Sequence, residues 1–234
     1  MKFVTKKEFV HKADQVAHGL GQSIKSNLSD FLEFAYEYPV VLNRKGGIKL
    51  SEVSTPEETE RYLSGLLTSY FGRKARAITL GEVQTVADPA VDTVLEAFGT
   101  IPKNQLPLYS QYHRLSMAAE NKIGGLLEEY LAEHLEPKGW FWCCGNIIKG
   151  VDFFRAGRPV TLLQVKNRDN SENSSSEKIR ELLRKEGCPV DIQKWHRCQS
   201  SDGKACWDEF PGAGGKAQLT EKDFLEFIRD YPKK

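Results

Sequence analysis

Apolar side chains recur at helical spacing through the first hundred residues of the chain. Over residues 5–18 the spacing is three or four, and two glycines end the pattern, with apolar positions at Phe9, Val10, Ala13, Val16 and Ala17. A second segment of this kind covers residues 28–38. A third begins at Thr55-Pro56, a pair typical of a helix N-terminus, and runs to about residue 71. A fourth covers residues 88–98. The pattern predicts a mainly helical N-terminal region.

After residue 77, connections and strand-like runs appear among the helical segments. Residues 102–112 are polar and contain proline, which predicts a connection, and residues 115–135 then predict a long helix. Short apolar runs at residues 78–86, 140–146 and 160–165 predict strands, and the turn Gly157-Arg158-Pro159 predicts a hairpin between residues 150–155 and 160–165. A helix capped by Thr220 closes the chain. We expect an α/β fold, with a mixed central sheet flanked by helices. We divide it into a helical part (residues 1–113) and a core (residues 114–234), which could also form one compact domain.

The overall composition says little about function, but the distribution of charge along the chain says more. The net charge of the 234 residues is +1, but residues 137–204 contain thirteen Lys and Arg against eight Asp and Glu. A basic segment of this kind suits a nucleic-acid partner. No apolar run reaches the roughly 20 residues of a membrane helix, and the first residues lack the apolar core of a signal peptide, so we expect a cytoplasmic protein.

Three polar residues on the predicted hairpin carry the candidate chemistry. Gln164 and Lys166 are two residues apart on one strand and therefore share a face, and Asp152 on the neighbouring strand can meet them. Carboxylate and amide oxygens, helped by the Val165 carbonyl, suit Mg²⁺. The lysine can orient or deprotonate an attacking water and stabilise negative charge in a transition state. The arrangement predicts metal-dependent hydrolysis of a phosphodiester.

This layout resembles the PD-(D/E)xK nuclease superfamily, whose signature is an Asp, a variable gap and Glu-x-Lys. The gap between Asp152 and Gln164 is eleven residues, and Gln164 stands where Glu is usual. The continuation QVKNRDNSENSSS, from residue 164, most resembles the SinI/AvaII family of type II restriction endonucleases, which cut GGWCC (W is A or T). The resemblance covers residues 120–184.

The resemblance implies a PD-(D/E)xK core and Mg²⁺-dependent, sequence-specific cleavage of double-stranded DNA that leaves 5′-phosphates. It also implies a homodimer and a cognate DNA methyltransferase in the same system, though not in a complex with this chain. The helical part would embrace DNA or dimerise. Because Gln164 is neutral, a further carboxylate is expected from the helix before the sheet. The candidates are Glu128 and Glu120, with Glu128 preferred.

Hydroxyl, amide and basic side chains beside the catalytic strand can bind phosphates or read base edges. The candidate DNA contacts are Asn167, Arg168, Asn170, Ser171, Asn173, Ser174, Ser175, Lys194, His196 and Arg197. Ser174 and Glu177 also fit a capping box at the start of the helix that follows.

Other functions remain open. The same core could belong to a repair or junction nuclease that recognises DNA structure, or Gln164 could mark an inactive DNA-binding protein. A zinc site could use Cys188, Cys198 and Cys206 with the nearby His196, but the spacing lacks the closely paired cysteines of recognisable sites. No cysteine lies in a recognisable nucleophile context for a Cys-His hydrolase.

Overall fold

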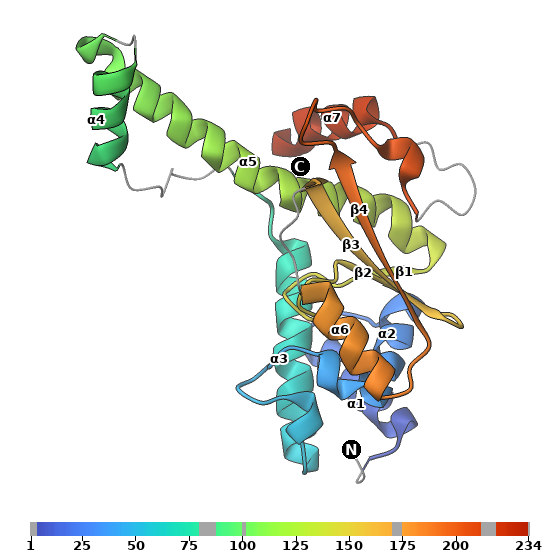
Figure 1. The fold of residues 1–234 in the computed structure, drawn as a ribbon. Helices are drawn as coiled ribbons and strands as arrows, with labels where there is room; N and C mark the ends of the chain where they lie inside the picture. Colours follow the sequence, from blue (N-terminus) through green and yellow to red (C-terminus); the bar gives the residue numbers. More distant parts are fainter. Residues whose placement is uncertain (1–3, 80–87, 100–101, 170–174, 212–218, 234) are drawn as a thin grey trace.

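The computed structural model describes residues 4–79, 88–99, 102–169, 175–211 and 219–233, without the side chains of residues 92, 103 and 175–177. Its elements lie in a helix-rich body from which one helical arm projects (Figure 1). Within these ranges, no helix combines the length and the apolarity needed to cross a membrane.

Three N-terminal helices form where the apolar spacing predicts them. They are α1 (Lys6–Gly19), α2 (Ser26–Glu37) and α3 (Pro56–Ala75). Thr5 and Glu8 make a capping box at the start of α1. The Thr55 hydroxyl accepts a hydrogen bond from the backbone N–H of Glu58 at 3.1 Å, with proline at the first helical position of α3. The N-terminal helices are thus confirmed, although α3 continues four residues beyond the expected end.

The connection predicted at residues 102–112 is wrong for most of its length. Helix α5 (Leu106–Leu135) begins nine residues before the expected start and includes Pro107 in its first turn. Proline is tolerated there because the first N–H groups of a helix have no partner within the helix. The predicted helix at residues 88–98 is confirmed as α4 (Pro89–Phe98), capped by Asp88. Residues 78–79 are not in a strand, and residues 80–87 of that predicted strand lie outside the described residues.

The sheet contains four strands in the described residues, in the order β1-β2-β3-β4. They are β1 (Trp140–Trp142), β2 (Phe153–Arg155), β3 (Val160–Arg168) and β4 (Val190–Cys198). The first three pair antiparallel and β3 pairs parallel with β4. The predicted hairpin is confirmed as β2 and β3. The strand predicted to reach residue 146 is wrong beyond Trp142, because the chain turns there through Gly145 at a φ of +77°, where a Cβ atom would lie 2.6 Å from the Ser69 carbonyl oxygen.

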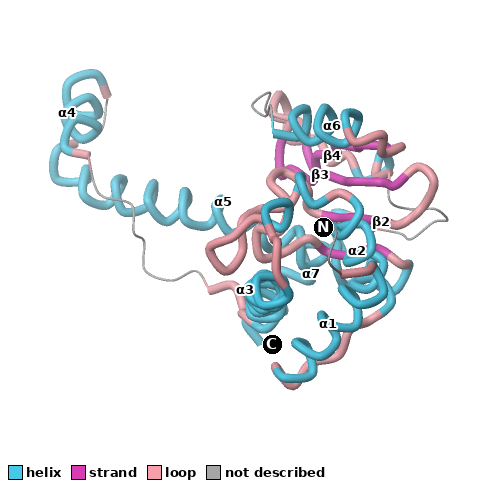
Figure 2. The backbone as a smooth tube through the Cα atoms, turned by 90° about the horizontal axis from the view of Figure 1, so that it is seen from below, coloured by secondary structure: helices cyan, strands magenta, loops and turns pink. Residues whose placement is uncertain are grey.

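Helices cover the sheet on both faces (Figure 2). On one face Phe31 of α2 stacks on Phe141 at 4.4 Å between ring centroids and meets Phe154 edge-on at 5.5 Å. On the other, Trp195 packs against Trp207, which contacts Phe224 of α7 (Glu221–Asp230). Helix α6 (Ser175–Lys185) packs against β4. This α/β arrangement, a mixed sheet flanked by helices, confirms the predicted fold class.

Short 3₁₀ turns join the larger elements. In the described residues they cover Pro39–Val41, Leu50–Glu52, Lys103–Gln105, Glu136–Lys138, Trp207–Glu209 and Tyr231–Lys233. The core combines residues of α1, α2 and α3 with residues of the sheet and of the second half of α5.

The aromatic contact between α2 and the sheet gives a test of the fold. We expect Phe31→Ala to lower the free energy of unfolding by about 3–5 kcal/mol, because a fully buried ring is lost and a cavity remains. Leu225→Ala, on the exposed face of α7, is the control and should change it by less than about 1 kcal/mol. Equilibrium unfolding in urea measures both, and equal losses would contradict the proposed core.

Candidate active site

Asp152 lies where the pairing of β2 with β3 ends. Its backbone N–H donates to the Leu163 carbonyl at 2.9 Å, and its Oδ2 accepts a hydrogen bond from the Val165 N–H at 2.7 Å. The carboxylate therefore accepts the Val165 N–H, which a backbone carbonyl would accept if the pairing of β2 with β3 continued. The Asp152 carbonyl in turn accepts from the Cys143 N–H at 2.8 Å. These bonds fix both the backbone and the side chain of Asp152.

Glu128 reaches the same place from α5. The Trp142 indole N–H donates to Glu128 Oε2 at 3.0 Å. The Arg73 guanidinium lies 5.1 Å above the Trp142 ring and forms an ion pair with Glu129 at 2.8 Å. Glu128 is thus oriented by a tryptophan at the end of β1, which is itself held between α3 and α5.

The two carboxylates interact electrostatically. Burial raises the pKa of Asp152 to about 7, and repulsion from Glu128 acts in the same direction. Burial also raises the pKa of Glu128, whereas the Trp142 hydrogen bond, Arg73 and Lys166 oppose this increase. Lys166 and the Val165 N–H favour ionised Asp152 as well. Asp152, Glu128 and Lys166 therefore form one electrostatic cluster, with two negative charges that repel each other.

The remaining candidates lie along β3 and β4. Gln164 is only 4% exposed, whereas Lys166 is partly exposed. The register places Lys194 beside Gln164 and His196 beside Lys166, so these four residues share one face of the sheet. Lys194 is exposed and His196 is partly exposed, as a contact with a phosphate backbone would require.

The donor set fits a hard divalent cation. Asp152 and Glu128 supply carboxylate oxygens, both side chains are partly open to solvent, and their mutual repulsion would be relieved by a positive ion. Oxygen donors with room for water are typical of Mg²⁺ sites. No cluster of three or more His, Cys, Asp and Glu suited to a metal lies in the described residues. An ion here would therefore depend on two carboxylates, with the Gln164 amide oxygen, the Val165 carbonyl or water completing its shell.

Glu120 does not join this cluster in the same way. It is exposed on α5, eight residues before Glu128, which corresponds to about 12 Å along the helix axis. Of the two candidates, Glu128 is the one that interacts with Asp152 and Lys166.

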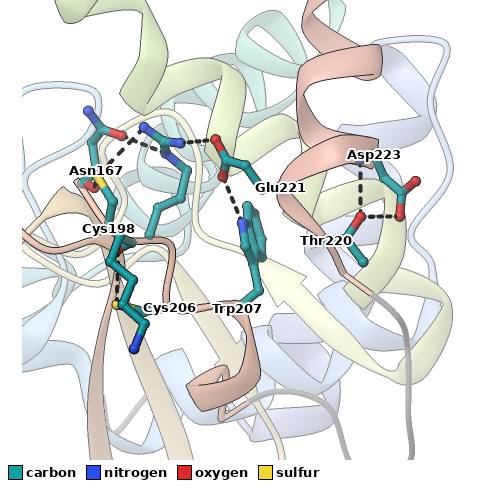
Figure 3. Close-up of polar contacts among 9 residues, drawn as sticks. Asn167, Cys198, Cys206, Trp207, Thr220, Glu221 and Asp223 are labelled. Atoms are coloured by element: carbon teal, nitrogen blue, oxygen red, sulfur yellow. Dashed lines mark hydrogen bonds and ion pairs between the residues drawn. The ribbon is translucent and has the colours of Figure 1, made fainter. Parts of the chain in front are cut away.

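The candidate DNA contacts have different surroundings. Arg168 is exposed at the end of β3. Arg197 donates to Asn167 Oδ1 at 2.8 Å and forms an ion pair with Glu221 of α7. Glu221 also accepts a hydrogen bond from the Trp207 indole N–H at 2.8 Å (Figure 3). DNA contact by Asn167 or Arg197 would have to compete with these bonds. Residues Asn170, Ser171, Asn173 and Ser174 lie outside the described residues, so the predicted capping box does too, and the side chain of Ser175 is not described.

Comparison with known proteins bears on this geometry. The family model for SinI restriction endonuclease matches residues 11–234. The type II restriction enzyme Eco47I of Escherichia coli is 38% identical over 231 residues, which is 95% of each chain. The type II restriction enzyme SinI of Salmonella infantis is 44% identical over 153 residues, or 64% of each chain.

The chain belongs to the SinI restriction endonuclease family. The resemblance seen in QVKNRDNSENSSS is therefore confirmed, and it extends well beyond residues 120–184. Members of this family are type II restriction endonucleases, that is, hydrolases that bind DNA and cut it at specific sites. Asp152, Glu128, Gln164 and Lys166 all lie within the matched range.

Sequence reasoning missed one residue of the site. Trp142 lies in an apolar run and was expected only as part of a core strand. Its indole N–H nevertheless orients Glu128. A buried tryptophan needs an acceptor for its indole N–H. The signal for this role was that Trp142 lies in a predicted strand that directly follows the helix carrying Glu128.

The raised pKa of Asp152 has a consequence for stability. A carboxyl group whose folded-state pKa lies above its unfolded value favours folding while it is protonated. That contribution is lost as the pH rises from about 4 through about 7. Asp152→Asn keeps an acceptor for the Val165 N–H without the charge. At pH 8 in EDTA, its free energy of unfolding should therefore be roughly 1–3 kcal/mol higher than that of wild type.

Urea unfolding at pH 8 and pH 5 measures this difference, which should shrink at the lower pH. Asp230→Asn is the control, since this exposed acid has a lowered pKa because it bonds to Lys233, and its loss should not stabilise the fold. A less stable Asp152→Asn protein at pH 8 would contradict the electrostatic account.

Proposed function

We propose that the chain is a type II restriction endonuclease that requires Mg²⁺ and hydrolyses phosphodiester bonds of double-stranded DNA to give 5′-phosphates. The observation that carries the proposal is the cluster of Asp152, Glu128 and Lys166 at the end of the β2–β3 pairing, in a member of a restriction endonuclease family. Within enzyme classes this corresponds to EC 3.1.21.4.

Each residue of the cluster has a role in this chemistry. Asp152 and Glu128 would hold the ion, and the Gln164 amide oxygen and the Val165 carbonyl would complete the protein ligands. A bound Mg²⁺ supplies Lewis-acid stabilisation of charge on the phosphate oxygens. Lys166 orients the attacking water, promotes its deprotonation and stabilises the negative charge of the transition state. The water oxygen forms a bond to phosphorus as the P–O3′ bond breaks. The proton of the water goes to solvent and the leaving 3′-oxygen takes one up, which gives a 5′-phosphate and a 3′-hydroxyl.

Recognition requires further parts of the chain. Lys194 and His196, beside the catalytic residues on the sheet, would contact the phosphate backbone. Arg168 and the Ser- and Asn-rich segment after it would read bases, and GGWCC is the proposed target, from the resemblance to the SinI/AvaII family. A symmetric site cut on both strands requires a two-fold homodimer. The enzyme would act in the cytoplasm alongside a separate methyltransferase that protects host DNA.

Removal of the lysine ammonium tests the proposed chemistry. Lys166→Ala should lower the cleavage rate by about 10²–10³-fold or more, the scale lost with one electrostatic stabiliser of a transition state. DNA binding measured without metal should stay within a few-fold of wild type. The matched control is Lys138→Ala, an exposed lysine of the turn after α5, which should cleave normally. Undiminished cleavage by the Lys166 variant would remove the mechanism.

Digestion of plasmid DNA of known sequence tests the specificity. With Mg²⁺, we expect discrete bands whose mapped ends fall in GGWCC and carry 5′-phosphates, and no cutting of a matched plasmid in which those sites are mutated. Cleavage without discrete bands would instead favour a nuclease that recognises DNA structure. Binding without cleavage in either Mg²⁺ or Mn²⁺ would indicate an inactive DNA-binding protein.

A further inference from the structure

Exposed apolar side chains are concentrated on one projecting part of the molecule. Eight of the eleven large hydrophobic residues that are exposed in the described part of the chain lie between residues 91 and 117. This part, α4 with the first half of α5, is called the arm below and projects away from the sheet and the other helices in both views (Figures 1 and 2).

The exposed residues of the arm form stripes. On α4, Val91, Val94 and Phe98 follow spacings of three and four and are 46%, 55% and 87% exposed. On α5, Leu108, Tyr112 and Leu115 follow spacings of four and three and are 50%, 62% and 36% exposed. Such stripes are the contact faces of packed helices.

The second half of α5 shows what this stripe does when it is covered. Leu126 and Tyr130 continue it at helical spacing, and both are buried in the core. The same face of one helix is therefore covered near the sheet and open on the arm. Helix α4 has only ten residues, and isolated helices shorter than about 12–15 residues are marginal in water. An additional packing partner would stabilise both helices.

The charges of α4 do not suit DNA as that partner. Residues 88–98 contain Asp88, Asp92 and Glu96 and no Lys or Arg. Phosphates would be repelled by this helix. Residues 106–117 of α5, in contrast, contain His113 and Arg114 and no acid. One arm is therefore complementary to another arm in charge as well as in its apolar surface.

The exposed apolar surface of the arm supplies a large part of the area that a dimer interface needs. Aromatic side chains bury roughly 150–250 Å² each, and aliphatic side chains bury less. Eight of them, about one-third to nine-tenths exposed, present several hundred Å² per chain. A stable interface of standard size buries about 800 Å² per partner.

We propose that the arm is the homodimer interface, in which α4 and α5 of one chain pack against α4 and α5 of a second copy as a four-helix bundle. The inference rests on the proposed function in one respect, since a symmetric DNA site is what calls for a second copy.

The test is the mass of the full-length chain in solution, measured by light scattering without DNA or metal. Wild type should have the mass of two 26.5 kDa chains at micromolar concentration. Phe98→Glu on α4 and Tyr112→Glu on α5 should each weaken dimerisation by roughly 30-fold or more, the scale of an interface hot spot. The double variant should have the mass of one chain.

Leu225→Glu is the matched control, since this leucine is 47% exposed but lies on α7, and it should remain dimeric. Circular dichroism and thermal melts establish that the variants are folded. Phe98→Glu provides a safeguard, because α4 contributes no side chain to the described core. Monomeric wild type, or a dimeric double variant, would overturn the proposal.

Cleavage separates this inference from the proposed function. Monomeric variants that accumulate nicked plasmid, where wild type gives linear DNA, support both. A dimeric wild type with monomeric variants and no cleavage by any protein would keep the interface and reject the endonuclease. Cleavage at discrete sites by a double variant that is still a dimer would keep the endonuclease and reject the interface.

Discussion

The arrangement of the site depends on a carboxylate that replaces a backbone acceptor at the end of a strand pair. Asp152 accepts the Val165 N–H at 2.7 Å, which fixes its position against β3. The same position brings it close enough to Glu128 for their charges to repel, and burial adds to the cost of ionising both. In the absence of a cation, ionising both of these buried carboxyl groups is unfavourable. The proposed Mg²⁺ site accounts for it, because a divalent ion would convert the repulsion into shared attraction.

The supporting structure is distributed over distant parts of the sequence. Glu128 is held by Trp142 from β1, and Trp142 is packed against Arg73 from α3. Arg73 in turn pairs with Glu129, the neighbour of the candidate ligand on α5. A helix, a strand end and an ion pair thus orient one carboxylate. Site geometry on rigid elements of this kind is what metal-dependent chemistry requires.

Much of the fold follows from local pattern. The spacing of Phe9, Ala13 and Ala17 predicted α1, and the turn at residues 157–159 predicted the hairpin that carries Asp152, Gln164 and Lys166. Local pattern failed where long-range contacts decide. The chain leaves β1 at Trp142 because Gly145 packs against Ser69, which is far away in sequence. Trp142 could not be assigned to Glu128 without the position of α5, and the pairing of Arg197 with Glu221 was hidden for the same reason.

The central claim is that one divalent ion lies between Asp152 and Glu128, next to Gln164. A crystal grown with Mn²⁺ tests it most directly, because Mn²⁺ can take the place of Mg²⁺ among oxygen ligands and its anomalous signal locates it. We predict a single peak within about 2.0–2.6 Å of oxygens from both carboxylates, with the Gln164 oxygen within about 5 Å of an Asp152 oxygen. A peak elsewhere, or a Gln164 oxygen too far from Asp152 to share an ion, would contradict the account.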